Sequence, residues 1–575
     1  MRRTAAAEID ESADTGSAGE VVARPVPGSL WDAVIGAALL SMLALALFAP
    51  SFLAGIPAGD SYHFNYAWTS AFASQWSLAD PYPRWLAAMW EGAGSADFHF
   101  YPPLFFVVAA GAMAVTGSGA VMGQVIAAIV FHALSGIGTA SLARALGIGR
   151  YGAFAAGAAV MLAPYHLLDW FIRNANAEIA AYPAIAFTMA GFARVLGERR
   201  GHTMLALGAA ASMFAHILAA PIAAVGCLAI LIAYRRGLSW RRLMPGIGIG
   251  LLGVLAAAVY WLPAVGLRDT VTASVLLSFH WSTNIFGLGT LLQDSLTGSI
   301  YRMALTLSLI ALALVGLARS EARASATVLG ILGTVWFLMS PLGRGVWAYT
   351  PLEIMQFPWR FTLLLDIGVA LAVGLGVDRL HRLRGAAAMV LHRRALGGLM
   401  AAAAIAAALF QPAWWRVEPY RIHAEWALAS HVGVIEWLDF GEHEYSFHRG
   451  VLGRRGSVMP PLEGAPLIAV SGEGNRVEVL EDTPRDLRFA AACATPCEIV
   501  VKRGFWRFWE LEGPAGAVTI RATTPHPLVT ATLPAGAGTY RLRLPTHPIV
   551  YAGAALSGLT IIALLVLGWR YRRAV

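Results

Sequence analysis

The chain has 575 residues, of which 57% are hydrophobic and only 13% charged, and its mean hydropathy is +0.61. A soluble domain carries about 25% charged residues, so the composition excludes an ordinary soluble protein and predicts a polytopic α-helical membrane protein. The net charge is +8. The basic residues gather at the ends of apolar runs, as membrane topology requires, so we expect membrane lipids and no nucleic acid as partners.

Residues 1–29 are rich in Ala, Gly, Ser and acidic residues and lack apolar periodicity, which predicts a disordered cytoplasmic tail. About twelve apolar runs follow, and runs of roughly 20 residues are what a bilayer requires. We expect transmembrane helices at roughly 30–54, 119–143, 151–167, 178–196, 203–217, 219–234, 244–264, 301–318, 325–341, 358–378, 392–410 and 549–570. Residues 30–410 would form the main transmembrane domain, and 549–575 a final helix with a cytoplasmic tail.

Arginine clusters fix the expected orientation. They follow alternate runs, for example Arg144 with Arg150 and Arg235 with Arg236, and such clusters mark cytoplasmic loops. Both termini then lie in the cytoplasm of a bacterial cell, with the chain in the inner (cell) membrane. The apolar stretch 102–117 is short, and a crossing there would turn every later cluster outward. We therefore expect it to form a re-entrant or interfacial helix.

The last external segment, about 412–548, alternates apolar and polar residues between Gly and Pro turns, as in N-R-V-E-V-L-E and T-Y-R-L-R-L-P. This period of two predicts an extracytoplasmic antiparallel β-sandwich. Cys493 and Cys497 lie in it as C-A-T-P-C. That spacing fits neither a redox nor a zinc motif, so we expect a local disulfide.

Polar residues of the first external loop are candidates for chemistry. Asp60 follows the first apolar run in G-D-S-Y-H-F-N-Y, which contains His63, and His99 lies in D-F-H-F-Y-P-P. Asp60 would either cap an amphipathic helix at about 61–76 or act as a base or metal ligand at the bilayer edge.

The second and fourth external loops add further charges. Asp169, Arg173 and Glu178 lie within ten residues between two apolar runs. They would form either a structural ion pair with a helix N-terminal Glu or an acidic site beside a cation that neutralises phosphate. Arg360, in Q-F-P-W-R-F, would either reach the membrane interface or bind phosphate. His132 and His216 are the main ionisable residues inside apolar runs, and we expect structural roles for both.

These motifs, in this order, resemble the GT-C superfamily of membrane glycosyltransferases, and most of all the bacterial 6-pyruvoyl-tetrahydropterin synthase-related membrane proteins. The segment at Asp60 also resembles the first loop of the oligosaccharyltransferase catalytic subunit, and Arg173 to Glu178 its second-loop acidic motif. That family usually has two acidic residues where this chain has Asn174, Asn176 and Glu178, which puts metal dependence in doubt. Its W-W-D-Y-G acceptor motif is absent, so peptide glycosylation is not expected.

The resemblance implies an inverting transferase that moves a sugar from a polyprenyl-phosphate donor to an extracytoplasmic glycan or lipid. Asp60, Glu178 and Asp169 would be catalytic, and Asp60 and Glu178 would hold Mg or Mn if a metal binds. Donor phosphate would be bound by Arg173, Arg360, His99 and His63. The alternative is a non-catalytic scaffold or a transporter-like carrier of glycan or lipid. A proton-coupled carrier needs carboxylate pairs within the membrane, and we identify none from the sequence.

Overall fold

The computed structural model describes residues 30–57, 61–89, 92–198, 200–236, 238–270, 281–317, 322–382, 464–523 and 528–574. Four predictions fall outside these ranges: the tail at 1–29, the apolar run at 392–410, the part of the β-rich domain before residue 464, and the role of Asp60. For His63 the backbone alone is described. These predictions remain untested by the fold.

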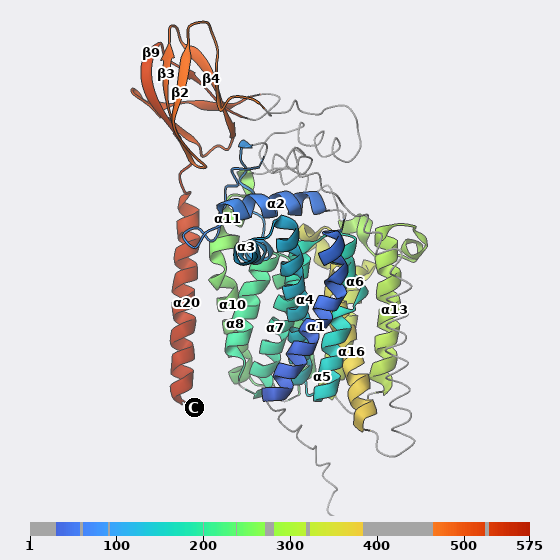
Figure 1. Cartoon of the computed structure of the whole chain (residues 1–575). Helices are drawn as coiled ribbons and strands as arrows, with labels where there is room; N and C mark the ends of the chain where they lie inside the picture. The colour runs from blue at the N-terminus through green and yellow to red at the C-terminus, as the bar shows by residue number, and fades with distance from the viewer. Residues whose placement is uncertain are drawn as a thin grey trace, which may run out of the picture.

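The described residues form a helical bundle with a β-rich domain beyond one end (Figure 1). Within the described ranges, eight helices are long and apolar enough to cross a membrane, or nine if one bent pair counts as a span. The predicted total of about twelve is not confirmed, and one of the predicted spans, 392–410, lies outside these ranges. The eight are α1 (Leu30–Ala54), α4 (Ala120–Ala145), α5 (Arg150–Met161) continued by α6 (Pro164–Phe171), α7 (Asn176–Glu198), α13 (Leu296–Leu317), α14 (Ala322–Met339), α16 (Thr362–Arg382) and α20 (Pro548–Ala574).

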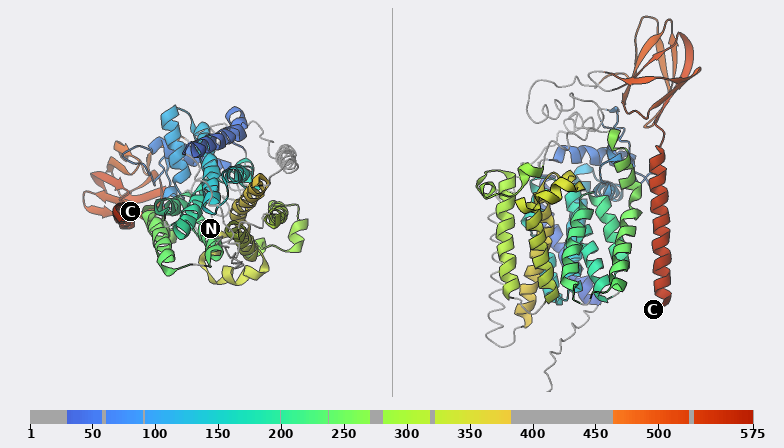
Figure 2. Two further views of the ribbon diagram at one scale, coloured as in Figure 1. Left: turned by 90° about the horizontal axis from the view of Figure 1, so that it is seen from below. Right: turned by 180° about the vertical axis from the view of Figure 1, so that it is seen from behind.

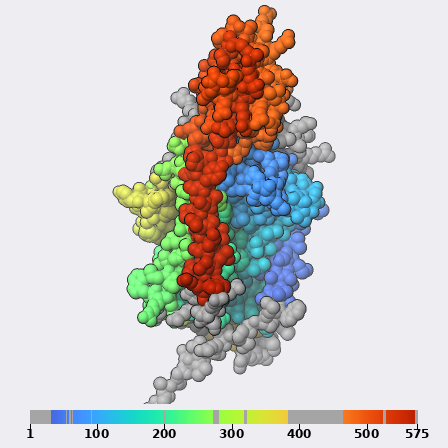
Figure 3. Space-filling view, turned by 90° about the vertical axis from the view of Figure 1, so that its left-hand side faces the viewer, coloured from blue at the N-terminus to red at the C-terminus, as the bar shows by residue number. Residues whose placement is uncertain are grey.

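Three predicted spans differ from simple crossings. Two form shorter apolar helices, α8 (His202–Ala215) and α9 (Ala219–Tyr234). The third is broken into α10 (Trp240–Ala256) and α11 (Ala258–Gly266), which meet at 69°. At the break, the backbone N–H of Val259 donates to Ser557 Oγ of α20 over 2.8 Å. The last helix therefore satisfies a donor that the bend leaves open, and it packs along this side of the bundle (Figure 3).

The first loop contains two helices that do not span. In Figure 1, α2 (Tyr62–Gln75) lies across one end of the bundle, where an amphipathic helix was predicted. α3 (Leu104–Thr116) has 13 residues and ends at Gly117, whose φ of 66° suits glycine. Thirteen residues rise about 20 Å, which is less than the roughly 30 Å of a bilayer core. The length of α3 accords with the predicted non-spanning helix.

The two ends of the bundle differ in charge. One end, here called the arginine face, carries the α4–α5 connection, the ends of α7, α9, α13 and α16, and the starts of α8, α10 and α14. There Arg150 pairs with Asp32 of α1 at 3.2 Å, and Asp378 pairs with Arg382 at 2.6 Å. The opposite end, the loop face, carries α2, the links 172–175 and 216–218, and the start of α16. The predicted cytoplasmic and external loops thus separate onto opposite ends of the molecule.

The described part of the β-rich domain contains two antiparallel sheets, with strand orders β1-β4-β8-β7 and β2-β3-β9-β5-β6. The alternating sequences noted above fall on these strands, and β3 and β4 alternate buried and more exposed residues along their length. The strands are β1 (Ile468–Val470), β2 (Arg476–Thr483), β3 (Asp486–Cys493), β4 (Cys497–Gly504), β5 (Glu510–Gly513), β6 (Gly516–Val518), β7 (Ile520–Ala522), β8 (Leu528–Leu533) and β9 (Gly536–Arg543).

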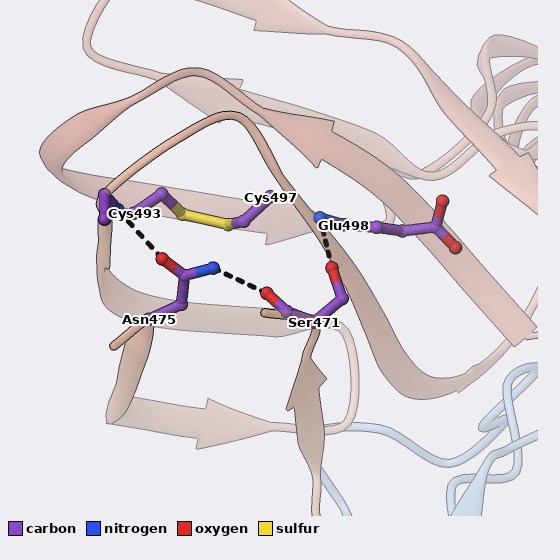
Figure 4. Close-up of a disulfide and its surroundings, with 6 residues drawn as sticks. Ser471, Asn475, Cys493, Cys497 and Glu498 are labelled. Carbon is purple, nitrogen blue, oxygen red and sulfur yellow. Dashed lines mark hydrogen bonds between the residues drawn. A yellow bond between two sulfur atoms is a disulfide. The ribbon is translucent and has the colours of Figure 1, made fainter. Parts of the chain in front are cut away.

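A disulfide joins Cys493 to Cys497 (Figure 4). β3, which ends at Cys493, belongs to one sheet, and β4, which begins at Cys497, belongs to the other. The bond therefore closes the connection by which the chain passes between the two sheets. Asn475 supports the same connection, because its Oδ1 accepts from the backbone N–H of Ala494 and its Nδ2 donates to the carbonyl of Ser471.

The β-rich domain shares one hydrophobic core with the first loop. Trp85 is 2% exposed and packs edge-on against Trp509, with ring centroids 5.3 Å apart, and it stacks on Trp506. The backbone N–H of Gly504 donates to the carbonyl of Ala93 over 2.7 Å. A Cβ at Gly504 would lie 2.7 Å from the carbonyl oxygen of the neighbouring loop glycine, so this approach requires glycine. The domain and α20 lie at one side of the bundle (Figure 2).

Candidate functional site

A tight link between α6 and α7 builds the centre of the loop face. α6 begins with Pro164 in its first turn, where proline is tolerated, and ends at Phe171. Asn174 has φ 52°, a left-handed conformation that Asn adopts more readily than most residues. Its neighbour Ala175 donates its backbone N–H to the carbonyl of Asp169 over 2.6 Å. The reversal brings the end of α6 and the first turn of α7 side by side.

The link places Arg173 between two carboxylates. Its Nη1 donates to Asp169 Oδ1 over 2.5 Å and to Glu178 Oε2 over 2.8 Å, and its Nη2 donates to Glu178 Oε1 over 2.9 Å. Tyr165 joins them, since its hydroxyl donates to Glu178 over 2.7 Å and accepts from Arg173 over 2.9 Å. All three charged residues are at most 8% exposed. The predicted group Asp169, Arg173 and Glu178 is thus brought together in space.

Arg360 reaches the same carboxylate from another element. It lies on the 3₁₀ turn η8 (Pro358–Phe361), directly before α16, and its Nε is 3.2 Å from Glu178 Oε1. Its Nη1 donates to the carbonyl of Met355 over 2.8 Å, across a turn in which Gln356 has φ 61°. A positive φ at a non-glycine residue is strained and is often found at functional sites. The backbone before η8 therefore helps to direct Arg360 toward Glu178.

Two guanidinium groups and two carboxylates therefore form one buried charge cluster. Burial lowers the pKa of Arg173, but Glu178, Tyr165 and Asp169 outweigh it and hold that pKa well above its ordinary value. The guanidinium also lies over the Trp359 ring, 4.9 Å from its centroid. Arg173 is therefore a permanently charged, fully coordinated residue in the middle of the cluster.

A small cavity of about 10 Å³, room for little more than one water, adjoins Glu178 and Arg360. His216, between α8 and α9, is its other polar lining residue. Burial and the positive charge of Arg360 lower the pKa of His216 to about 4, although Glu178 opposes the shift. The lining residues are Glu178, Ala181, His216, Leu218, Ala219, Ile222, Arg360 and Leu363.

The side chains of the motif D-F-H-F-Y in the first loop pack against different parts of the molecule. Asp97 accepts from the Trp68 indole over 2.8 Å, and Tyr101 packs on that indole with ring centroids 4.3 Å apart. Burial, together with the charge of Glu178, raises the pKa of Tyr101 to about 12, so Tyr101 lies within electrostatic reach of the cluster.

His99, predicted to bind donor phosphate, points elsewhere. Its ring packs against Trp506 of the β-rich domain, with centroids 4.6 Å apart, and it is 7% exposed. Burial, reinforced by the nearby Arg84, lowers its pKa to about 3. Because the neutral ring lies in the interface with the β-rich domain, the structure does not bring His99 to the two arginines.

A second polar layer lies next to the charge cluster, and the sequence analysis missed it. Asp366 of α16 is 1% exposed. It accepts from the backbone N–H of His166 in α6 over 3.2 Å and from the Tyr182 hydroxyl of α7 over 2.9 Å. The His166 and Tyr182 rings stack with centroids 3.7 Å apart. Asp366 lies inside the apolar run predicted at 358–378. An acidic residue in such a run often has a functional role, and this signal could have identified Asp366 from the sequence.

The two layers use the same three elements. α6 supplies Tyr165 to the first and His166 to the second, and α7 supplies Glu178 and, one turn on, Tyr182. The α16 segment supplies Arg360 and Asp366. Asp366 acts as the N-terminal cap of α6, because the helix's own cap residue, Ala163, makes no side-chain hydrogen bond. This layer fixes α6 against the helix that follows Arg360.

The first loop is fastened to the same link through asparagines. The side chain of Asn65 in α2 donates to the carbonyl of Asn174 over 2.5 Å. Ser61, the residue after Asp60, donates its backbone N–H to the carbonyl of Arg173 over 3.0 Å. Asp60 itself lies outside the described residues, but its immediate neighbour in the chain is thus bonded to the α6–α7 link.

The described residues do not fit the predicted metal site at Glu178. Both of its carboxylate oxygens contact guanidinium groups, which disfavour a divalent cation at the same atoms. Within the described ranges, no group of three or more His, Cys, Asp or Glu side chains is arranged to hold a metal ion. We therefore derive no step through Mg or Mn.

No known family profile matches the chain, and no curated protein matches it. Among solved structures, it is similar to the arabinofuranosyltransferase AftD from Mycobacteria, at TM-score 0.43 and 16% identity over 62% of this chain and 24% of that one. It is also similar to the oligosaccharyltransferase of Archaeoglobus fulgidus, at TM-score 0.36 and 12% identity over 66% of this chain and 54% of that one.

This chain therefore spans about a quarter and about half of those two proteins. By their names, one transfers arabinofuranosyl groups and the other oligosaccharides. At these TM-scores the likeness is remote, and a function for this chain has to be argued from its own site. The label of 6-pyruvoyl-tetrahydropterin synthase-related protein has no support among these comparisons.

Proposed function

We propose that the chain is a GT-C-like membrane glycosyltransferase, which transfers a sugar from a polyprenyl-phosphate donor to a hydroxyl of an extracytoplasmic glycan or lipid. The observation that carries the proposal is the buried cluster of Arg173, Glu178 and Arg360 on the loop face. Buried charges are costly in a membrane protein and are generally kept for function. Two guanidinium groups at the bilayer edge suit a substrate whose phosphate is anchored there by a lipid.

The two arginines would have different tasks. Arg173 Nη1 donates to Asp169, Glu178 and Tyr165, and its Nη2 donates to Glu178, so Arg173 holds Glu178 in place. Arg360 makes one contact to Glu178 and one to a backbone carbonyl. Its Nη2 makes no hydrogen bond to any described group. We assign the phosphate contact to Arg360, because a guanidinium can present two parallel donors to phosphate.

Asp169 and Glu178 would then position the cations. Asp169 is 0% exposed and pairs with Arg173, and both oxygens of Glu178 are bonded to arginine. Because guanidinium groups hold both of its oxygens, Glu178 is a poor proton acceptor. We therefore assign the role of general base to Asp60 alone. His63, in the same segment, remains a candidate for binding the phosphate of the sugar donor.

The reaction would be a direct displacement. The acceptor oxygen attacks the anomeric carbon of the donor sugar while the bond between that carbon and the phosphate oxygen breaks. The acceptor proton passes to Asp60, and the polyprenyl phosphate leaves with the bonding electrons. Charge grows on the leaving phosphate, and donors fixed in a dry site stabilise such charge best. One displacement of this kind inverts the anomeric configuration.

The location of the site supports transfer outside the cytoplasm. The cluster lies on the loop face, and the arginine-rich ends of the helices lie on the other. By the positive-inside rule we expect the arginine face on the cytoplasmic side of the bacterial cell membrane, and with it both termini. The β-rich domain beyond the loop face would meet extracytoplasmic glycans or lipids.

The test is transfer or release of sugar from radiolabelled polyprenyl-phosphate sugars by the purified full chain in nanodiscs. Arg344→Lys is a suitable control, because Arg344 is exposed on α15 (Arg344–Tyr349). If the chain is a transferase, wild type should transfer or release the sugar. Arg360→Lys should lower this activity, and Arg344→Lys should leave it unchanged. Specific binding of the lipid without release or transfer of any sugar tried would favour the scaffold or carrier instead.

A further inference from the structure

His216 offers a donor that no group in the cluster uses. The residue ends α8, with extended backbone at φ −164° and ψ 129°. Its Nδ1 accepts the backbone N–H of Leu218 over 3.1 Å, and its carbonyl accepts that of Ala219 over 2.8 Å. His216 thus fixes the turn between α8 and α9, and its ring is held by its own backbone.

The bond to Leu218 fixes the tautomer of the ring. A neutral imidazole has one N–H and one acceptor nitrogen, and the hydrogen bond at one nitrogen determines the state of the other. Because Nδ1 accepts, the proton of the neutral ring must lie on Nε2. The lowered pKa of about 4 keeps the ring neutral at physiological pH. The Nε2–H therefore remains a donor throughout the physiological range.

The ring of His216 lies within electrostatic reach of Arg360, Glu178 and Arg173. His216 lines the small cavity together with Glu178 and Arg360, and the rest of the lining is apolar. Within the described residues, no group accepts a hydrogen bond from His216 Nε2 or from Arg360 Nη2. The side chains that carry these two donors, one charged and one neutral, both line this cavity of about 10 Å³. Glu178 is the single acceptor there, and guanidinium groups occupy both of its oxygens.

We propose that His216 Nε2–H and Arg360 together bind one phosphoryl oxygen of the lipid-linked donor, and that this contact fixes the phosphate at the end of the α8–α9 turn. The inference rests on the proposed function, since it names a further contact of that same site. His216 would bind substrate as a neutral hydrogen-bond donor. It would therefore recognise the phosphate by geometry, whereas Arg360 recognises it by charge.

Two variants separate this role from a structural one. In His216→Asn the short amide can still accept from Leu218 N–H, near the position of Nδ1, but it cannot reach the position of Nε2. In His216→Gln the longer amide places an N–H near Nε2 but gives up the turn. If His216 contacts the phosphate, phosphate binding should weaken in His216→Asn and persist in His216→Gln. If His216 only stabilises the turn, the Asn variant should behave as wild type and the Gln variant should be impaired.

The measurement is the affinity of the full chain in phosphatidylcholine nanodiscs for radiolabelled undecaprenyl monophosphate, with thermal unfolding of each variant alongside. We expect His216→Asn to bind about tenfold more weakly than wild type and His216→Gln to stay within about threefold of it. Inorganic phosphate should compete for the site, and about tenfold less well in the Asn variant. The lipid should bind far more tightly than inorganic phosphate, because the tail contributes buried area.

Wild-type affinity in His216→Asn, or equal losses in Asn and Gln, would overturn the contact. Equal competition by inorganic phosphate in wild type and His216→Asn would do the same. If wild type binds no undecaprenyl monophosphate at all, the proposed function fails with it. If wild type binds the lipid and the His216 variants bind it equally well, this inference is wrong but the proposed function still stands.

Discussion

Glu178 and Arg360 come from different helical elements, yet Glu178 Oε1 lies 3.2 Å from Arg360 Nε, on the loop face. The pair joins the α6–α7 link to the start of α16. Arg173 already bonds both oxygens of Glu178, so Glu178 would stay in place if Arg360 turned toward a substrate. We therefore regard Arg360 as the cation that a substrate can engage, and its exchange is the most direct test of the site.

Arg360→Lys should weaken donor binding about tenfold, because lysine keeps the charge but cannot present two parallel donors. Affinity for undecaprenyl monophosphate in nanodiscs measures the effect, with Arg344→Lys as the control at an exposed position. A structural ion pair would tolerate lysine. Unchanged affinity and unchanged thermal stability in Arg360→Lys would leave Arg360 as an interfacial anchor.

Asp60→Asn should lower turnover by roughly 10²–10⁴ while membrane insertion and abundance stay normal. Asn retains the shape and the capping ability of Asp but loses its basicity. Sugar transfer by purified variant and wild type at equal protein concentration measures the change. A helix cap predicts a nearly silent substitution, so wild-type turnover in Asp60→Asn would remove this residue from the mechanism.

Asp366→Ala should destabilise the bundle by about 1–3 kcal/mol, because it leaves the buried N–H of His166 and the Tyr182 hydroxyl without their acceptor. Asp366→Asn keeps an oxygen acceptor at the same place and should retain most stability and turnover. Thermal unfolding in detergent and turnover of both variants provide the readout. If Asn is as damaging as Ala, the charge of Asp366 matters and its role exceeds that of a cap.

Acidification should loosen the contact between the β-rich domain and the first loop through His99. Its pKa is about 3 in the folded chain against an ordinary 6.5, so protons favour the unfolded state. The stability that neutral His99 contributes is complete above pH 6.5 and is lost progressively as the pH falls toward 3. Limited proteolysis between pH 7 and 4 follows the loosening. A His99→Phe variant should show a smaller pH dependence, and an identical one would contradict this account.

Cys493 and Cys497 should resist thiol labelling until a reductant is added, because the disulfide closes the connection between the sheets. Cys227 lies among apolar residues of α9 and gives the background signal. Equal labelling of denatured protein with and without reductant would refute the bond. Replacing both cysteines with Ser should lower the stability of the β-rich domain by about 2 kcal/mol or less, since the closed loop is short.

Much of the helical architecture could be predicted from the sequence. The apolar run at 30–54 coincides with α1, and the arginine clusters lie together on one face, because both signals are local. The break between Ala256 and Ala258 was missed although Pro263 lies one turn further on, and a proline cannot bond the carbonyl four residues before it, here that of Val259. Hydropathy alone reports how apolar a segment is and not whether it stays straight.

The site was predicted in part for the same reason. Asp169, Arg173 and Glu178 are close in sequence, and their meeting needs one turn only. Asp366 was missed because its donors come from two other helices. His99 was predicted to bind donor phosphate, and its motif, D-F-H-F-Y-P-P, does include a residue near the charge cluster, Tyr101. A change in side-chain direction within that motif sends Tyr101 toward the cluster and His99 toward the β-rich domain, and single-residue direction in an irregular loop is not readable from sequence.

The shared core of the first loop and the β-rich domain has a consequence for biogenesis. Arg503 contacts the carbonyl of Gly92 across 411 positions of the chain, and Trp85 packs against Trp506 and Trp509 of the C-terminal domain. In the proposed topology the first loop would be translocated early in synthesis, long before these partners are translated. Premature termination anywhere before residue 500 would therefore leave an inserted bundle with an exposed tryptophan surface, which quality-control proteases recognise.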